Sequence, residues 1–107
     1  MTNRINPLSD SVSTESVRNN KDESRFEYGS GNDLAVSNYS IRGDKIIFTH
    51  TEVPEALEGQ GIGNKLARAA LDYARSNDLR VVPRCQFIAA FIKRHSEYQD
   101  LVDSDYS

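Results

Sequence analysis

The sequence predicts an α/β (α+β) fold in which a mixed, mainly antiparallel sheet packs against two main helices. Three observations lead to this fold class. Runs of alternating or β-branched residues come first, over 25–53. A glycine-rich segment then opens an amphipathic helix, and a second β-type run is followed by a second helix. A doubly wound nucleotide fold is excluded, because its strands alternate with helices from the start.

The first half of the domain is expected to be an antiparallel meander of three strands. Residues 25–28 alternate polar and aromatic side chains, residues 34–42 form the second strand, and β-branched residues crowd 45–53. Gly43-Asp44 is a two-residue hairpin signal. The apolar phase of 34–42 shifts midway, which indicates a bulge or burial on both faces.

The second half is expected to alternate helix and strand. Apolar residues at helical spacing predict a helix over 61–75, and a helical crossover favours parallel or near-parallel pairing of the strands that it joins. The remaining expected elements are a strand over 79–82 that Pro83 closes, a helix from 85 or 86 to 95, and a short turn or helix over 97–102.

Composition limits the class of protein. The chain has 107 residues and a net charge of −3, which fits one small domain without the basic excess of a nucleic-acid-binding protein. Its apolar runs are far shorter than the ~20 residues that span a bilayer. The single cysteine allows neither an internal disulfide nor a cysteine-based metal site. We therefore expect a cytoplasmic monomer or homodimer with no metal, no nucleic acid and no membrane partner.

The N-terminal segment differs in composition from the rest. Residues 1–23 are rich in Ser, Asn, Asp and Thr, and the first 16 of them lack the apolar region of a signal peptide. Such a segment buries too little apolar surface to offset the entropy of ordering. We expect a flexible extension over 1–23 and a folded domain over 24–107.

Residues 58–64, EGQGIGN, follow a strand and open a helix. Glycines without a Cβ allow a tight turn and a close approach to a ligand. The N–H groups of the first helical turn, together with the helix dipole, favour an anion there. The spacing matches neither a phosphate-binding P-loop nor a dinucleotide fingerprint. The residues alone leave two alternatives, a phosphate cradle or a tight structural loop.

This segment resembles the pyrophosphate-binding motif of the GCN5-related N-acetyltransferases, Gln/Arg-x-x-Gly-x-Gly/Ala. The first motif position is Glu58, whose ionised side chain cannot donate to a phosphate, so backbone donors must bind it. Ser96 also stands where relatives usually have proline. Residues 24–102 look like the minimal single-domain branch of the superfamily through HTEVP at 50–54, EGQGIGNKLARAALDYAR at 58–75, LRVVPRC at 79–85, FIAAFIKRH at 87–95 and EYQDLV at 97–102.

The resemblance implies an acyl-CoA N-acyltransferase-like fold that binds acetyl-CoA and transfers its acetyl group to an unknown amine. The strands at 45–53 and 79–82 would splay apart at a bulge, with the pantetheine arm between them and Pro54 preventing pairing. Arg68 could add charge near the phosphates or be solvated only. The implied cofactor-binding residues are Val53, Gly59, Gln60, Gly61, Ile62, Gly63, Asn64 and Lys65; Arg84, Lys93 and Arg94 are candidates for the 3′-phosphate.

Acetyl transfer requires a base for the amine and an acid for the leaving thiolate. The resemblance makes Glu52, at the end of a strand and expected to be buried, the first candidate base. His50 shares its face by strand alternation and could orient it or relay a proton. Tyr98 could protonate the thiolate, while His95 could simply stabilise a helix C-terminus. Each of these residues also has a purely structural interpretation.

Cys85 is the most unusual residue, because it lies between a proline and the expected start of a helix. A thiolate at a helix N-terminus is nucleophilic, and this one could accept the acetyl group and pass it on. A single cysteine is more often a small buried apolar residue. Two non-catalytic functions also remain, an acyl-CoA-binding, sensing or interaction module and a purely structural domain.

Overall fold

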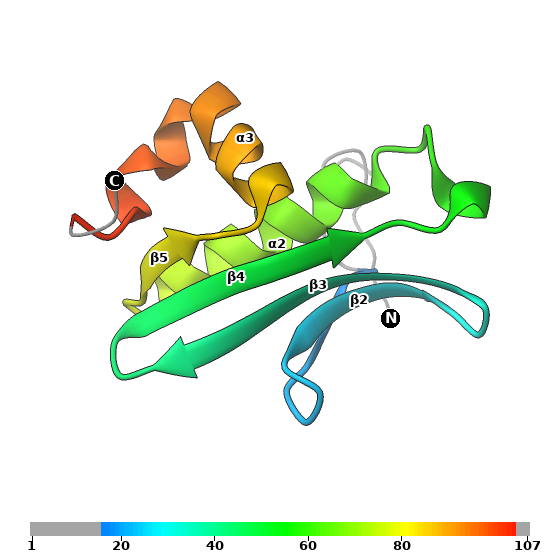
Figure 1. The fold of residues 1–107 in the computed structure, drawn as a ribbon, viewed down its shortest axis with the longest axis horizontal. Coiled ribbons are helices and arrows are strands. Elements are labelled where there is room, and N and C mark those ends of the chain that lie inside the picture. Colours follow the sequence, from blue (N-terminus) through cyan, green and yellow to red (C-terminus); the bar gives the residue numbers. More distant parts are fainter. Residues whose placement is uncertain (1–15, 105–107) are drawn as a thin grey trace, which may run out of the picture.

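The computed structural model describes residues 16–104, which form one five-stranded sheet covered by helices (Figure 1). Residues 1–15, which belong to the extension predicted over 1–23, and residues 105–107 lie outside the described residues. The strands are β1 (Arg18–Asn20), β2 (Arg25–Ser30), β3 (Asp33–Arg42), β4 (Lys45–Glu52) and β5 (Arg80–Pro83). The helices are α2 (Ile62–Ser76) and α3 (Gln86–Arg94), with short 3-10 segments η1 (Glu55–Leu57) and η2 (Ser96–Leu101).

The topology confirms the predicted fold class. The strand order is β1-β2-β3-β4-β5, with antiparallel pairing from β1 to β4 and parallel pairing of β5 with β4. In Figure 1, β4 leads to the η1 loop and α2 returns behind the sheet to reach β5. The parallel pair follows from that crossover, because a helix between two strands carries the chain back to the starting edge.

The predicted extension is too long at its C-terminal end, because β1 pairs with β2 over residues 25–27. The polar strand β1 is held by Glu27 of β2, which is only 6% exposed. This carboxylate accepts hydrogen bonds from Arg25 Nε at 2.6 Å and Asn20 Nδ2 at 2.9 Å. The Arg25 hydrogen bond is the main reason why the pKa of Glu27 lies below its usual value. A prediction based on apolar content missed β1, because the strand is ordered by the buried charge of Glu27.

The expected bulge is present, and the extra residue belongs to β4. Asn38 pairs with His50 and Tyr39 with Phe48, so Thr49 has no register partner in β3. This insertion reverses the alternation of β4 relative to a regular strand. Thr51 consequently shares the face of Phe48, whereas His50 and Glu52 share the other face.

The core lies between the sheet and α2. Phe26 of β2 contacts both Tyr39 and Tyr73 of α2, with ring centroids 5.4 and 5.6 Å apart. Small side chains on α2 allow the helix to approach the sheet closely. The buried residues of α2 are Ile62, Leu66, Ala67, Ala70, Leu71 and Ala74.

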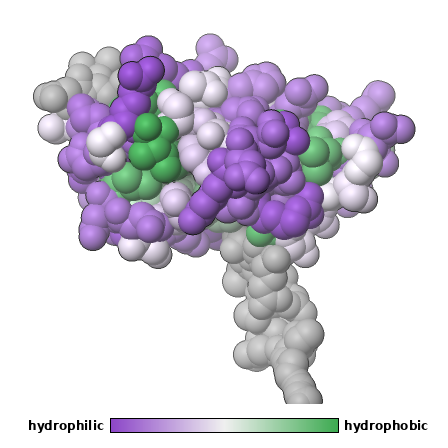
Figure 2. All heavy atoms as spheres, turned by 90° about the horizontal axis from the view of Figure 1, so that it is seen from below, coloured by the Kyte–Doolittle hydropathy of each residue, from purple (hydrophilic) through white to green (hydrophobic). Residues whose placement is uncertain are grey.

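The surface seen from below is mainly hydrophilic, with hydrophobic side chains confined to compact patches (Figure 2). Among the described residues, Ile41 and Phe87 are the large hydrophobic side chains that are exposed. No helix within 16–104 is both long and apolar enough to cross a membrane. Phe87 is the exposed residue that bears on the site described next.

Candidate functional site

The glycine loop turns the chain from η1 into α2 through two left-handed residues. Gly59 has φ +84° and Gly61 has φ +74°, a region that favours glycine. Gly61 is the N-cap of α2, and its carbonyl accepts the first helical hydrogen bond from the Lys65 N–H at 3.1 Å. The glycines at 59 and 61 are thus required by backbone conformation.

The first N–H groups of α2 are free to bind a ligand. No side chain caps α2, and within residues 16–104 the N–H groups of Ile62, Gly63 and Asn64 form no hydrogen bond. These three donors and the positive end of the helix dipole favour an anion at this position. The predicted cradle has the donors that it needs.

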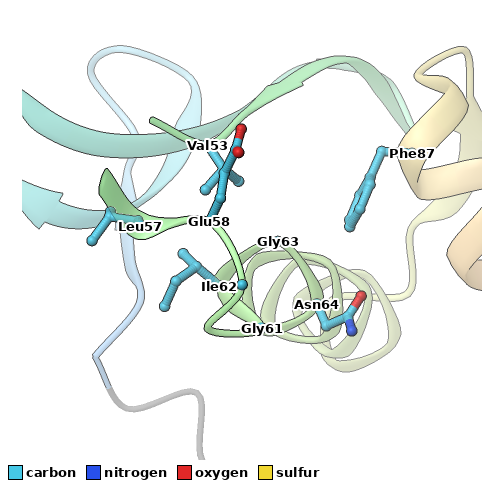
Figure 3. A pocket seen from close by; sticks show the side chains of 9 residues that line it. Val53, Leu57, Glu58, Gly61, Ile62, Gly63, Asn64 and Phe87 are labelled. Atoms are coloured by element: carbon cyan, nitrogen blue, oxygen red, sulfur yellow. The ribbon is translucent and has the colours of Figure 1, made fainter. Parts of the chain in front are cut away.

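A cavity of about 230 Å³ opens directly above this turn (Figure 3). Val53 and Glu58 lie on one side of the cavity and Phe87 lies on the other, with Gly63 between them. The Glu58 carboxylate places negative charge on this wall, as the departure from the family motif suggested. The full lining is Val53, Leu57, Glu58, Gly59, Gly61, Ile62, Gly63, Asn64 and Phe87.

Six of the eight predicted cofactor-binding residues line this cavity, and Gln60 and Lys65 do not. Gln60 is exposed and donates to the Ala56 carbonyl at 3.3 Å. The Lys65 ammonium lies over the Tyr28 ring, 5.5 Å from its centroid. The spacing of the glycines was enough to predict the loop. The directions of the Gln60 and Lys65 side chains could not be predicted, because they depend on contacts with Ala56 and Tyr28.

Pairing between β4 and β5 stops beside the cavity, as the expected splay requires. Phe48 and Pro83 are the last paired residues, but β4 continues to Glu52. Cys85, the N-cap of α3, donates its N–H to the Phe48 carbonyl at 2.9 Å. Its buried sulfur lies 3.2 Å from the Thr51 hydroxyl, which in turn lies 3.1 Å from the Ser37 hydroxyl.

Glu52 and His50 lie together, as strand alternation predicts, with Glu52 Oε1 and His50 Nε2 3.5 Å apart. Their side chains are 70% and 62% exposed, so the expected burial of Glu52 is wrong. The β4 register directs both away from the face that carries Thr51 and Cys85. The structure therefore separates these two acid–base candidates from the thiol.

Tyr98 is buried against α2 rather than against the glycine loop. Its hydroxyl donates to Asp72 Oδ1 at 2.7 Å and accepts from Arg68 Nη1 at 3.3 Å. Burial, followed by the Asp72 hydrogen bond, raises the pKa of Tyr98 to about 12. Within 16–104, no described interaction joins this hydroxyl to Glu52 or Cys85.

The remaining basic candidates lie away from the loop. Arg68 is held by Tyr98 and by Glu97, whose carboxylate is 3.7 Å from Nη1. His95 stacks on Phe91, with ring centroids 3.9 Å apart, and its Nδ1 is 2.8 Å from the Phe91 carbonyl. Arg84, Lys93 and Arg94 are exposed and do not line the cavity. No cluster of metal-ligating side chains occurs among residues 16–104.

The model of a family described as "GCN5-related N-acetyl-transferase" matches residues 25–101. The chain belongs to this family. The match covers the folded part from β2 to the end of η2, and so includes both the glycine loop and Cys85.

Known relatives in the GCN5-related family agree with this assignment. Protein NATD1 from Bos taurus is 44% identical over 64 residues, which are 59% of this chain and 57% of that protein. The Homo sapiens protein is 41% identical over the same length, with the same shares of each chain. The chain thus spans less than two thirds of the length of these relatives.

A solved structure of the family supports the fold. A GCN5-like protein from Staphylococcus aureus, determined by NMR in solution, is 30% identical and has a TM-score of 0.67. The similarity covers 85% of this chain and 90% of that chain. The mixed sheet with a helix entering from a glycine loop is therefore the GCN5-related fold.

Three residues that line the cavity were not predicted from the sequence to contact a ligand. Leu57 belongs to η1, which no periodic pattern in the sequence predicts. Glu58 was noted only as a departure from the family motif. Phe87 falls within the helix expected from 85 or 86 to 95, and its ring lines the cavity. An apolar residue two positions after Cys85 gave no sequence signal of its own.

Proposed function

We propose that this chain is an acetyl-CoA-dependent N-acetyltransferase that transfers an acetyl group to an amine. The main support is the juxtaposition of three free N–H groups at the start of α2 with the end of β4–β5 pairing. The first feature suits a pyrophosphate, and the second suits an extended arm that leads from it. We also place the protein in the cytoplasm, where a chain with a single cysteine and hence no internal disulfide would be at home.

The residues that surround the cavity fit acetyl-CoA, which supplies an activated acetyl group as a thioester. The N–H groups of Ile62, Gly63 and Asn64 would bind its pyrophosphate. Val53 and Leu57 would pack against the aliphatic part of the pantetheine arm. The acetyl end would then lie toward Cys85, at the N-terminus of α3.

In a direct transfer, Glu52 would act as the general base. The acceptor ammonium would lose a proton to the Glu52 carboxylate, through water if it is not in contact, while His50 holds the carboxylate in place. The amine nitrogen would then bond to the acetyl carbon as the carbon–sulfur bond breaks. The bonded nitrogen would release its second proton, and the departing thiolate would take up this proton, so that free CoA and an amide are formed.

In a two-step transfer, Cys85 would be the nucleophile. Its thiol would lose a proton, its sulfur would bond to the acetyl carbon as the original carbon–sulfur bond breaks, and the CoA thiolate would take up the proton that the thiol lost. The amine would then attack the acetyl group on Cys85, which would release the sulfur and form the amide. The Thr51 hydroxyl, 3.2 Å from the sulfur, would hold it toward β4.

A non-catalytic acyl-CoA-binding or sensing module is the second candidate. It is favoured by the separation of Glu52 from Cys85 on opposite faces of β4 and by the Tyr98 hydroxyl, which already donates to Asp72. Such a module would need only the cradle and the cavity. It would bind acetyl-CoA without releasing CoA when amines are present.

The two candidates are separated by turnover. The protein would be titrated with acetyl-CoA in a calorimeter and then incubated with acetyl-CoA and a panel of amines, with free CoA as the readout. An enzyme shows binding and amine-dependent CoA release, whereas a module shows binding alone. Absence of both heat and thermal shift would remove both candidates.

The route is separated by two variants. Glu52→Gln should abolish release by the direct route, and full turnover in that variant would remove Glu52 as the base. In the two-step route, acetyl-CoA should raise the mass of the intact protein by about 42 Da, the mass added by one acetyl group. Cys85→Ser should abolish this increase. Without such an increase in the wild type, the two-step route has no support.

A further inference from the structure

Phe87 is an exposed aromatic residue inside the candidate site. It is the second residue of α3 and is 37% exposed to solvent, and its ring faces the cavity (Figure 3). Exposure of a phenyl ring to water is unfavourable, and a ligand that covers the ring would gain this apolar contact. The position therefore suits contact with the apolar part of a ligand.

The first turn of α2 accommodates this ring by lacking a side chain. A Cβ added to Gly63 would lie 2.8 Å from Phe87 Cζ, closer than real Cβ atoms approach. Gly63 has no positive φ, unlike Gly59 and Gly61, so its backbone does not require glycine. The Phe87 ring therefore lies directly against Gly63, in the space that a side chain at 63 would enter.

We propose that the Phe87 ring is the wall on which the aliphatic arm of the phosphate-bearing ligand packs, and that it sets affinity for the arm rather than for the phosphates. This inference rests on the proposed function, because it takes acetyl-CoA as the ligand. It adds to that function a specificity-determining residue that lies on α3.

The position of the ring between two parts of the site supports this role. Gly63, which contacts the ring, carries one of the free N–H groups, and Cys85 lies two residues before Phe87 at the N-cap of α3. A ligand that extends from the donors of α2 toward Cys85 passes the ring. Across the cavity, Val53 offers a second apolar surface.

The size of the cavity supports one segment of a ligand rather than a whole one. Its volume of about 230 Å³ lies below the roughly 300–1,000 Å³ of pockets that enclose drug-sized ligands. Phe87 and Val53 give the cavity an apolar surface on each side, with the Glu58 carboxylate beside Val53, whereas the donors lie at the base of the cavity. An aliphatic arm attached to a phosphate satisfies both surfaces.

The test compares two ligands on three proteins. Coenzyme A and 3′-phosphoadenosine 5′-diphosphate, which lacks the pantetheine arm, are titrated into the wild type, Phe87→Ala and Phe87→Leu. Phe87→Ala should weaken coenzyme A by about tenfold, and Phe87→Leu, which keeps an apolar side chain, by less than about threefold. The arm-free nucleotide should change by less than about twofold in both variants.

Other outcomes overturn the inference, and they separate its failure from that of the proposed function. Equal losses for both ligands indicate general damage to the site, and no loss for either indicates that the ring has no contact with the ligand. A wild type that binds neither ligand overturns the proposed function together with the inference. Phe87→Leu keeps the test valid if Phe87→Ala does not fold, which thermal unfolding would reveal.

Discussion

The Thr51 hydroxyl lies 3.2 Å from the sulfur of Cys85, and this contact joins β4 to the N-cap of α3. The same hydroxyl lies 3.1 Å from that of Ser37 in β3. The contacts occur where β4 has passed its last residue paired with β5, Phe48. A chain of side-chain hydrogen bonds thus links three elements at the point where the sheet opens.

Removal of the Thr51 hydroxyl should destabilise the fold. In Thr51→Val, the fully buried Ser37 hydroxyl loses a partner, which costs about 1–3 kcal/mol of unfolding free energy. Thr51→Ser keeps a hydroxyl at this position and should lose less. Urea unfolding of both variants measures the difference, and a valine variant as stable as the wild type would show that the chain of hydrogen bonds contributes nothing.

Two glycines with similar conformations separate backbone strain from ligand binding. Gly61 has φ +74° and Gly31 has φ +60°, and an added Cβ meets no atom within 4 Å at either position. Alanine should therefore cost about 1–2 kcal/mol of stability at each, through φ alone. Only Gly61→Ala should weaken coenzyme A, by about threefold or more, because residue 61 begins the donor turn.

Calorimetry and urea unfolding check this pair, with Gly31→Ala in the β2–β3 turn as the matched control. Equal affinity of the two variants for coenzyme A would contradict the assignment of the glycine loop as the phosphate cradle.

Loss of the Glu58 charge should strengthen binding of a phosphate. Glu58 lines the same cavity as Ile62, Gly63 and Asn64, whose N–H groups are free, and its carboxylate repels an anion there. Glu58→Gln should lower the dissociation constant of coenzyme A by about threefold to tenfold at low salt. The gain should shrink as salt is added, because ions screen exposed charges.

Glu55→Gln is the control for net charge, because Glu55 belongs to the same loop but does not line the cavity. If both variants gain equally, the effect is due to net charge rather than to the position of Glu58.

Stability at high pH should depend on Tyr98. Burial and the hydrogen bond to Asp72 raise its pKa from 10.0 to about 12, so the folded protein keeps a proton that the unfolded chain loses. The unfolding free energy should therefore be unaffected by this group below pH 10 and decrease as pH rises toward 12. Tyr98→Phe lacks this group, and its decrease should be smaller by roughly 1–2 kcal/mol.

Urea unfolding at pH 9 and at pH 11.5 measures this difference between the wild type and Tyr98→Phe. Parallel losses in the two proteins would mean that the Tyr98 phenol titrates alike in the folded and unfolded states.

The predictable part of the fold followed from local patterns. The bounds expected for the main helix, 61–75, differ by one residue at each end from α2, because apolar spacing and the glycine entry are local signals. The strand β1 was missed because it has little apolar content, and the group that orders it is the buried polar side chain of Glu27 in the neighbouring strand. The glycine loop was found by spacing, whereas Phe87 was missed because its role depends on contact with Gly63.

The sequence by itself determined the order of the strands and helices from β2 onward apart from η1, the glycine entry into α2 and, through its motifs, membership in the GCN5-related family. These properties are encoded within short windows, where side-chain periodicity and backbone freedom act over a few residues. Only the tertiary structure decided which candidates meet. The unpaired Thr49 fixes the face on which each later residue of β4 lies, and so places Thr51 with Cys85 and directs Glu52 and His50 to the opposite face. A one-residue change in register turns every following side chain over, and pairing with β3 sets that register.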